Sequence, residues 1–492
     1  MPTVRAPRLL AALGLVPLVL LASTAFRSAP PAPAPTGVAA FDSSFVQRTM
    51  RVELAHTGGP GGEVVALDRV VSDGAWAGST TRLADETNLG TYQLLVLDRE
   101  TNRVLYSRGY SSLYAEWETT PEAKRTSRTF RESLRFPWPK RPVQVVLKRR
   151  DQENLFKEVA SFAIDPDAKS ANPAEPPRLG RVVPLFENGP PQRKVDLLVL
   201  GDGYTEAEMP KLRADAARLV GVLFETEPFK SRKADFNVRM LELPTSEPGV
   251  LRPQSKIFRR TFLGTQYDVF GSERYVLAPD ERPLRDAASN APYEFLEVLV
   301  NDAQYGGGGI YSDQATSSAD TAFAPYIFVH EFGHHFAGLA DEYYTSPVAY
   351  ETGAGGVKVE PWEPNVTALH DPERLKWKDL VAAGTPLPTP WEKETFETES
   401  KKTQAERKRL LDRGAPPAEL DALFRREREW ETKLLSSMKH SGRVGAFEGA
   451  AYEAKGLYRP AADCIMFTRD DVGFCPVCRR AIEKIVDLYA RP

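Results

Sequence analysis

Residues 323–343, FAPYIFVHEFGHHFAGLADEY, contain the stretch that decides the fold, and their first seven residues are largely apolar. Such a run predicts a buried helix that continues through His330 and His334. Residues four apart lie on one face of a helix, with a rise of about 6 Å, so both imidazoles can bind one Zn²⁺. Glu331 then stands beside the ion, where a carboxylate can accept a proton from water. The H-E-x-x-H pattern therefore predicts one catalytic zinc ion with Glu331 as the general base.

A catalytic zinc ion needs a third protein ligand, and the first candidates follow the helix. If the helix continued without a break, Asp341 would lie about 10 Å beyond His334 along the axis, out of reach of the ion. Gly338 permits a left-handed turn that ends the helix and folds the chain back. We therefore predict Asp341 as the third ligand, with Glu342 and the more remote Glu448 as alternatives.

The other histidines near or after this helix are not expected to bind the metal. His335 points about 100° away from His334 on the same helix. His370 and His440 have no partners at the spacing of metal ligands, so we expect them to be surface or hydrogen-bonded histidines.

The beginning of the chain predicts export. Arg5 and Arg8 precede an apolar run at residues 9–21, and small residues follow at 23–25. This order is typical of a cleaved signal peptide, which we place at residues 1–25. An uncleaved N-terminal anchor is the alternative, although the run is short for a membrane span. We predict a secreted or periplasmic protein with no stable membrane insertion after cleavage, and a Pro- and Ala-rich tether at residues 26–44.

The balance of charges in the chain argues against one class of partner. The chain has 492 residues, with 64 Lys and Arg against 67 Asp and Glu, and no basic stripe, so we do not expect a nucleic-acid partner.

Its three cysteines are Cys464, Cys475 and Cys478. Because an oxidising compartment favours disulfides, we predict a disulfide from Cys464 to one of the other two. No second C-x-x-C or nearby histidine completes a four-ligand zinc set with the C-x-x-C pair.

Two domains are expected. Short runs of β-branched and aromatic residues, separated by turn residues, predict an all-β, sandwich-like domain at residues 45–165. Its one histidine, His56, has no metal-ligand cluster around it, so we interpret the domain as a binding or chaperoning module. The proline-rich residues 166–192 then predict a linker.

A mixed α/β (α+β) domain is expected over residues 193–492. Residues 196–200 are typical of a buried strand, and Thr205 with Glu208 forms a capping box that opens a helix reaching about Phe224.

Two further segments of this domain have less regular sequences. Four glycines at 306–309 lack the Lys-Ser/Thr of a phosphate-binding loop, so we predict a flexible loop beside a cleft. The charged residues at about 391–440 predict an inserted, solvated helical hairpin.

The segment HEFGHHFAGLADEY at residues 330–343 resembles the bacterial IgA peptidase family of metallopeptidases. Further similar segments lie at residues 202–204, 236–238, 301–307, 385–390, 447–449 and 456–459, and in the β-rich region at 76–78 and 106–109. The resemblance covers nearly all of the chain after the signal peptide except the charged hairpin. It implies a metzincin-like peptidase domain, in which Met466 forms an apolar floor under the zinc. Gly338 and Asp341 each stand one place later than in the usual metzincin spacing, with Asp instead of the expected third His.

These observations favour a secreted zinc endopeptidase that acts on protein or peptide substrates. Tyr452 or Tyr458 is a candidate for stabilising the oxyanion of the transition state. The alternative from another class is a zinc-stabilised extracellular or cell-envelope binding protein without peptidase activity, in which the β-rich domain is the working part.

Overall fold

A computed structural model of the protein describes residues 40–345 and 358–490. The predicted signal peptide and most of the predicted tether therefore lie outside the described residues. Within the described ranges, no helix is both long enough and apolar enough to cross a bilayer.

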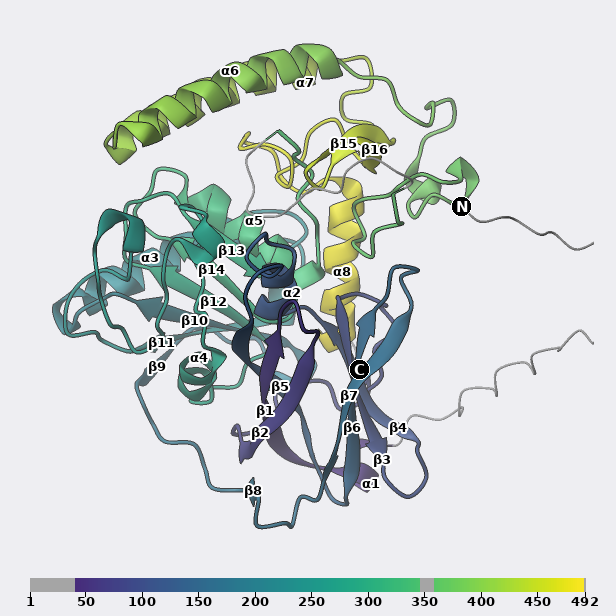
Figure 1. The fold of residues 1–492 in the computed structure, drawn as a ribbon, viewed down its shortest axis with the longest axis vertical. Helices are drawn as coiled ribbons and strands as arrows, with labels where there is room; N and C mark the ends of the chain where they lie inside the picture. The colour runs from purple at the N-terminus through teal and green to yellow at the C-terminus, as the bar shows by residue number, and fades with distance from the viewer. Residues whose placement is uncertain (1–39, 346–357, 491–492) are drawn as a thin grey trace, which may run out of the picture. The chain divides into compact units, whose positions relative to one another are not determined.

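The first part of the described chain is β-rich, as predicted. Its two four-stranded sheets have the strand orders β5-β1-β2-β8 and β4-β3-β6-β7 (Figure 1). The inner faces of both sheets contribute to one apolar core, which includes Val52 of the first sheet and Val96 of the second. The elements are α1 (Phe41–Ser44), β1 (Phe45–Gly58), β2 (Val64–Ser72), β3 (Tyr92–Asp98), β4 (Val104–Tyr110), α2 (Leu113–Glu118), β5 (Arg128–Pro139), β6 (Val143–Arg150), β7 (Phe156–Ile164) and β8 (Ala171–Asn172).

The fold begins slightly before the boundary expected from the sequence. Residues 41–44 were predicted to belong to the tether, but they form α1, and the Phe41 side chain is buried in the core of the β-rich region. The aromatic side chain gives this short segment enough apolar area to pack against the sheets, which a Pro- and Ala-rich tether lacks.

The second part is a mixed α/β unit built on a six-stranded sheet with the order β13-β14-β12-β10-β11-β9. The four inner strands are parallel, and the edge strands β9 and β13 run antiparallel to their neighbours. The elements are β9 (Arg181–Phe186), β10 (Val195–Asp202), α3 (Met209–Leu223), β11 (Phe236–Glu242), α4 (Glu281–Ala288), β12 (Phe295–Val300), β13 (Gly307–Ile310), β14 (Gln314–Ser318), α5 (Ala324–Ala337), α6 (Lys393–Asp412), α7 (Pro417–Ser437), β15 (Phe447–Ala450), β16 (Glu453–Arg459) and α8 (Pro476–Ala490).

Short 3-10 helices connect these elements. They are η1 (Pro191–Arg193), η2 (Glu206–Glu208), η3 (Lys233–Asp235), η4 (Pro253–Ser255), η5 (Val269–Gly271), η6 (Pro372–Arg374) and η7 (Lys378–Leu380). The predicted capping box is present at η2, where the Glu208 carboxylate accepts from the Thr205 backbone N–H at 2.9 Å.

Two expectations about irregular segments were wrong. The predicted linker at 166–192 contains β8 and the edge strand β9, in which Pro184 is tolerated because an edge strand has one unpaired side. The predicted flexible loop at 306–309 is largely β13. A Cβ at Gly309 would lie 2.3 Å from the Glu331 backbone oxygen, so the glycines allow this edge strand to pack directly on α5.

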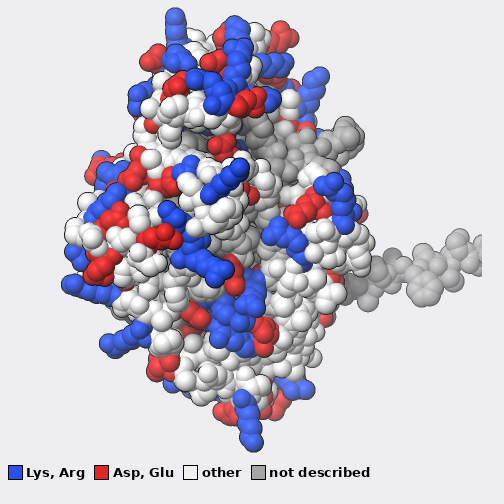
Figure 2. Space-filling view, turned by 60° about the vertical axis from the view of Figure 1, so that its left-hand side comes forward, with Lys and Arg blue, Asp and Glu red and all other residues white. Residues whose placement is uncertain are grey.

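The charged segment forms a helical hairpin, as predicted, from α6 and α7. Positive and negative side chains are interspersed over the upper part of the surface in Figure 2, where the hairpin lies. The hairpin is not solvated on every side. Phe424 of α7 packs against Tyr305 and Phe323, with ring centroids 5.3 and 5.7 Å apart, which fixes the hairpin close to the beginning of α5.

Polar contacts connect the β-rich region to the α/β unit. The Arg135 guanidinium lies 3.5 Å from the centre of the Tyr293 ring and donates to the Tyr293 carbonyl at 2.9 Å. The Ser133 backbone N–H donates to the Glu281 carboxylate at 3.0 Å. Because Glu281 and Tyr293 are buried, separating the two regions would expose an extensive polar network to water.

Candidate metal centre and active-site cleft

Helix α5 positions the two histidines of the H-E-x-x-H motif as the sequence predicts. Their Nε2 atoms lie 3.1 Å apart. The Nδ1 atom of His330 is 2.9 Å from the Ile465 carbonyl, and Nδ1 of His334 is hydrogen-bonded to the Leu339 carbonyl. Because a carbonyl can only accept, each ring carries a proton on Nδ1, and the Nε2 atoms are the ones that face the position of a metal.

Asp341 lies beside both histidines. Helix α5 ends at Gly338, whose φ of 60° is left-handed, and the chain then folds back. Asp341 Oδ1 is consequently 3.0 Å from His330 Nε2 and 3.2 Å from His334 Nε2. The structure thus brings together the three residues predicted from the sequence, and they form one of its candidate metal-binding clusters.

The spacing of these three atoms fits a zinc ion. In a tetrahedral site with metal–ligand distances of roughly 2.0 to 2.1 Å, neighbouring ligand atoms lie roughly 3.3 to 3.4 Å apart. The three separations of 3.0 to 3.2 Å are only slightly shorter. The donor set of two imidazoles and one carboxylate also matches a catalytic zinc site that keeps one position open.

Electrostatic attraction holds this cluster together. Burial disfavours the charged forms of both His334 and Asp341. Their attraction nevertheless raises the pKa of His334 to about 9 and holds the pKa of Asp341 well below its ordinary value. A cation that binds here must therefore displace a proton from His334 and take over its interaction with Asp341.

Tyr452 completes the immediate surroundings of Asp341. Its hydroxyl donates to Asp341 Oδ2, the carboxylate oxygen that does not face the histidines. Ala451 and Tyr452 have φ values of 47° and 64°, in the left-handed region that non-glycine residues rarely occupy. Such conformations cost about 1–3 kcal/mol each and concentrate at functional sites. Tyr458, the alternative candidate from the sequence, does not line the cleft.

The cluster opens into a cleft of about 440 Å³. Glu331 lines the cleft next to His334, and burial raises the pKa of its carboxyl above the ordinary value, as suits a proton acceptor. Gly307 and Gly309 of β13 form part of one wall, and α2 of the β-rich region contributes Glu116 and Glu118. The β-rich region therefore helps to shape the cleft.

Sequence profiles of two known families match the chain. The profile described as IgA Peptidase M64 covers residues 183–486, and the profile described as Peptidase M64 N-terminus covers residues 40–161. The chain belongs to the IgA peptidase M64 family. Membership implies a metallopeptidase that acts on protein or peptide substrates. No individual curated protein matches the chain in sequence.

The two alternative ligands of this M64 chain lie elsewhere. Glu342 lies in a separate cluster with three cysteines and does not belong to the cluster of the histidines. Glu448 is paired with Lys393 at 2.6 Å and accepts from the Gly456 N–H at 3.3 Å. Asp341 is thus the predicted third ligand that the geometry favours.

The other histidines do not join the metal cluster. His335 is buried against the sheet, where Nδ1 lies 2.9 Å from the Ile310 carbonyl and Nε2 accepts from the Leu296 N–H at 3.1 Å. His370 is exposed and His440 is buried, and neither belongs to a described candidate metal cluster.

Two features of the M64 cleft were not recognised in the sequence. Arg274 lines the cleft and donates to the Tyr343 hydroxyl at 3.2 Å, with its guanidinium carbon 5.5 Å from the centre of that ring. It comes from an irregular loop with no motif of its own. The contribution of α2 was also missed, because the contact between the two regions depends on the tertiary fold.

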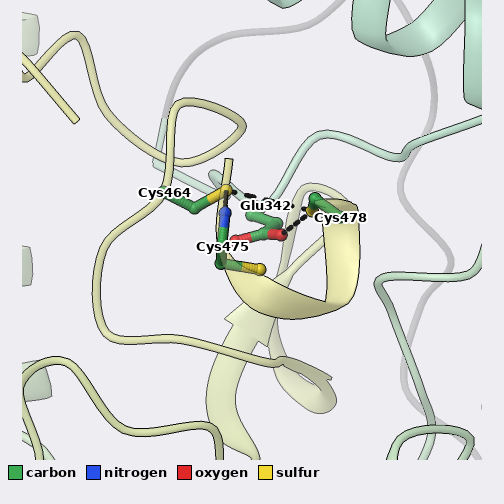
Figure 3. Close-up of side chains that lie close together, drawn as sticks. All are labelled: Glu342, Cys464, Cys475 and Cys478. Carbon is green, nitrogen blue, oxygen red and sulfur yellow. Dashed lines mark hydrogen bonds between the residues drawn. The ribbon is translucent and has the colours of Figure 1, made fainter. Parts of the chain in front are cut away.

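The prediction of a disulfide was wrong. All three cysteines lie in the described part of the chain and are free thiols, and the Cys464 and Cys478 sulfurs are 3.9 Å apart. As expected, neither a second C-x-x-C nor a histidine joins the C-x-x-C pair among the described residues, but Cys464 and Glu342 lie beside it and make a group of four possible metal ligands (Figure 3). Glu342 is 122 to 136 residues away in sequence, so no local spacing could indicate this contact.

Proposed function

We propose that this M64 chain is an exported, zinc-dependent endopeptidase with a metzincin-like catalytic domain and Glu331 as its general base. The observation that carries the proposal is the convergence of His330 Nε2, His334 Nε2 and Asp341 Oδ1 at one wall of a cleft that also contains Glu331. When bound, zinc would supply Lewis-acid chemistry by polarising the scissile carbonyl and lowering the pKa of water.

The residues of the chain have separate roles in this proposal. Glu331 accepts a proton from the attacking water and passes it to the leaving amine, a task favoured by the raised pKa of its carboxyl. The Tyr452 hydroxyl orients Asp341 in the resting protein and is close enough to the cleft to donate to the developing oxyanion.

Three features support the metzincin-like architecture. The helix with both histidines ends at a left-handed glycine, Gly338. An antiparallel edge strand, β13, packs against the same helix. Met466 is buried next to it, since a Cβ at Gly333 would lie 3.1 Å from the Met466 sulfur. The buried methionine thus packs against the helix that carries both histidines, in keeping with an apolar floor under the metal.

Export is proposed from the N-terminal sequence pattern. We expect the mature protein from its native host to begin between about Ala25 and Gly37, where small residues follow the apolar run. The match to the family begins at residue 40, so cleavage between residues 25 and 37 would leave the matched region intact. N-terminal sequencing tests this directly, and an intact Met1 on the exported protein would contradict it.

Casein degradation by the purified full chain, with and without a chelator, tests the activity. We expect Glu331→Gln to keep its metal and lose peptidase activity, because an amide cannot accept the proton of water while both imidazoles remain. Wild-type-like turnover by this variant would refute the mechanism. A wild-type protein that binds zinc but cleaves no protein substrate would instead favour the binding-protein alternative.

Metal content by mass spectrometry tests the third ligand. Asp341→Ala should lose the metal bound by the histidines, as His334→Ala does. Glu448→Ala is the matched control, because it removes a carboxylate that is paired with Lys393 outside the cluster. If Glu448→Ala loses this metal and Asp341→Ala retains it, the assignment of Asp341 is wrong, although the peptidase proposal would stand.

A further inference from the structure

A second group of metal-binding side chains lies next to the active site but outside its cleft. It consists of three thiols and one carboxylate, and each of these side chains is at most 6% exposed. Their ligand atoms all lie within 4.8 Å of one another, and Figure 3 shows the side chains pointing toward a common centre. We propose that this group binds a second, structural Zn²⁺ through Cys464, Cys475, Cys478 and Glu342.

The measured separations fit a metal site better than a disulfide. A zinc ion with Zn–S distances of about 2.3 Å and a Zn–O distance of about 2.1 Å places neighbouring sulfurs roughly 3.8 Å apart and sulfur and oxygen roughly 3.6 Å apart. Cys464 Sγ is 3.9 Å from Cys478 Sγ, and Cys478 Sγ is 3.4 Å from Glu342 Oε1. A disulfide would require the two sulfurs to approach to about 2.05 Å.

Glu342 has no other evident reason to be buried here. Its side chain is fully buried, and Oε1 accepts from the Asn365 amide at 3.0 Å. Oε2 has no hydrogen-bond partner among the described residues. A buried carboxylate oxygen without a partner is costly, and a cation bound between the carboxylate and the thiolates would remove that cost.

The surroundings also suit a thiolate site. The Cys475 backbone N–H donates to the Cys464 sulfur at 3.4 Å, an interaction that stabilises a thiolate. The buried Arg459 guanidinium interacts electrostatically with Glu342 and Cys464. Three thiolates and one carboxylate around Zn²⁺ leave two excess negative charges. The positive charge of Arg459 partly offsets them.

The location indicates a structural role. The four ligands come from three separate segments: the loop after α5, the turn containing Met466, and the beginning of α8, where Cys475 directly precedes the helix and Cys478 lies in its first turn. Glu342 directly follows Asp341, and its N–H donates to the Met466 carbonyl at 2.8 Å. Four protein ligands leave no open position for substrate, as in closed structural zinc sites. The second ion would therefore hold the loop that carries Asp341 against the Met466 turn.

The test is the metal stoichiometry of the full chain, purified without a chelator and dialysed. We expect two zinc ions per chain in the wild type and one in the His330→Ala/His334→Ala variant, which leaves the cysteine group intact. Because the chain has only three cysteines, every thiol signal reports on this group. Blocking the thiols of the histidine variant with an organic mercurial should release its remaining zinc.

Substitution of cobalt for zinc identifies the ligands without any cysteine variant that could fail to fold. The cobalt-loaded histidine variant should show a near-ultraviolet sulfur-to-cobalt charge-transfer band, which Glu342→Gln should weaken or shift. A histidine variant that holds no metal, or metal-loaded protein without the charge-transfer band, would overturn the proposal. So would a Cys464 disulfide in unreduced peptides of the native protein. None of these readouts depends on peptidase activity, so the second site can fail while the proposed function stands.

Discussion

Tyr452→Phe tests how the active site holds Asp341. The substitution removes only the hydroxyl that donates to Asp341 Oδ2. The ring remains, and so does its edge-to-face contact with Tyr343, where the ring centroids lie 5.5 Å apart. The change therefore removes the hydrogen bond to the buried carboxylate and keeps the aromatic ring in place.

The expected magnitude follows from the charge on that carboxylate. A hydrogen bond to a charged group contributes about 1.5–3 kcal/mol, which corresponds to a change of roughly 10- to 140-fold in a dissociation constant. We expect the zinc dissociation constant of the histidine site to rise by this factor. If the hydroxyl also donates to the oxyanion, kcat at saturating zinc should fall by a further factor of about 10² to 10³.

Competition with a chromogenic chelator measures the first effect, and peptide hydrolysis at saturating zinc measures the second. Tyr458→Phe is the matched control, since this tyrosine is the same residue type on the neighbouring strand β16 and does not line the cleft. The reasoning is refuted if Tyr452→Phe leaves both zinc affinity and kcat within twofold of the wild type, or if the control loses as much as the test variant.

Three further substitutions test the surrounding structure. Gly309→Ala should lower the free energy of unfolding by about 1–3 kcal/mol and reduce activity, because its Cβ would lie 2.3 Å from the Glu331 backbone oxygen; an unchanged melting temperature would contradict this. His335→Ala should cost roughly 2–6 kcal/mol in urea unfolding, because it leaves one N–H and one carbonyl unpaired in the interior, yet the folded variant should keep its full metal content. His56 is buried, which lowers its pKa, but the carboxylate of Glu132 outweighs burial and raises this pKa to about 9. Protonated His56 therefore stabilises the folded state fully below about pH 6.5. This contribution, about 3 kcal/mol at most, is lost as the pH rises through 9. Urea unfolding across this pH range should show a falling free energy of unfolding in the wild type but not in His56→Ala. Parallel pH profiles of the two proteins would contradict this role of His56.

The sequence alone determined the features that depend on local geometry. His330 and His334 had to share one helix face because their spacing matches the helical repeat. Gly338 indicated where that helix ends, and the Thr205–Glu208 capping box indicated where another begins, because both signals act over one turn. The alternation of buried residues in strands such as β3 likewise follows from the two-residue repeat of a strand.

Tertiary structure decided the features that depend on contacts between distant segments. Asp341 and Tyr452 are 111 residues apart, and their pairing exists only because the strands β15 and β16 pack beside the loop after α5. The glycines at 306–309 resemble a flexible loop by composition, but residues 307–310 form an edge strand, in which a Cβ at Gly307 or Gly309 would clash with α5. The number of cysteines predicted a disulfide. The fold instead places three free thiols beside Glu342, which is remote in sequence. Local patterns constrain which residues share one element, whereas side chains from different elements meet only where packing of the whole core brings them together.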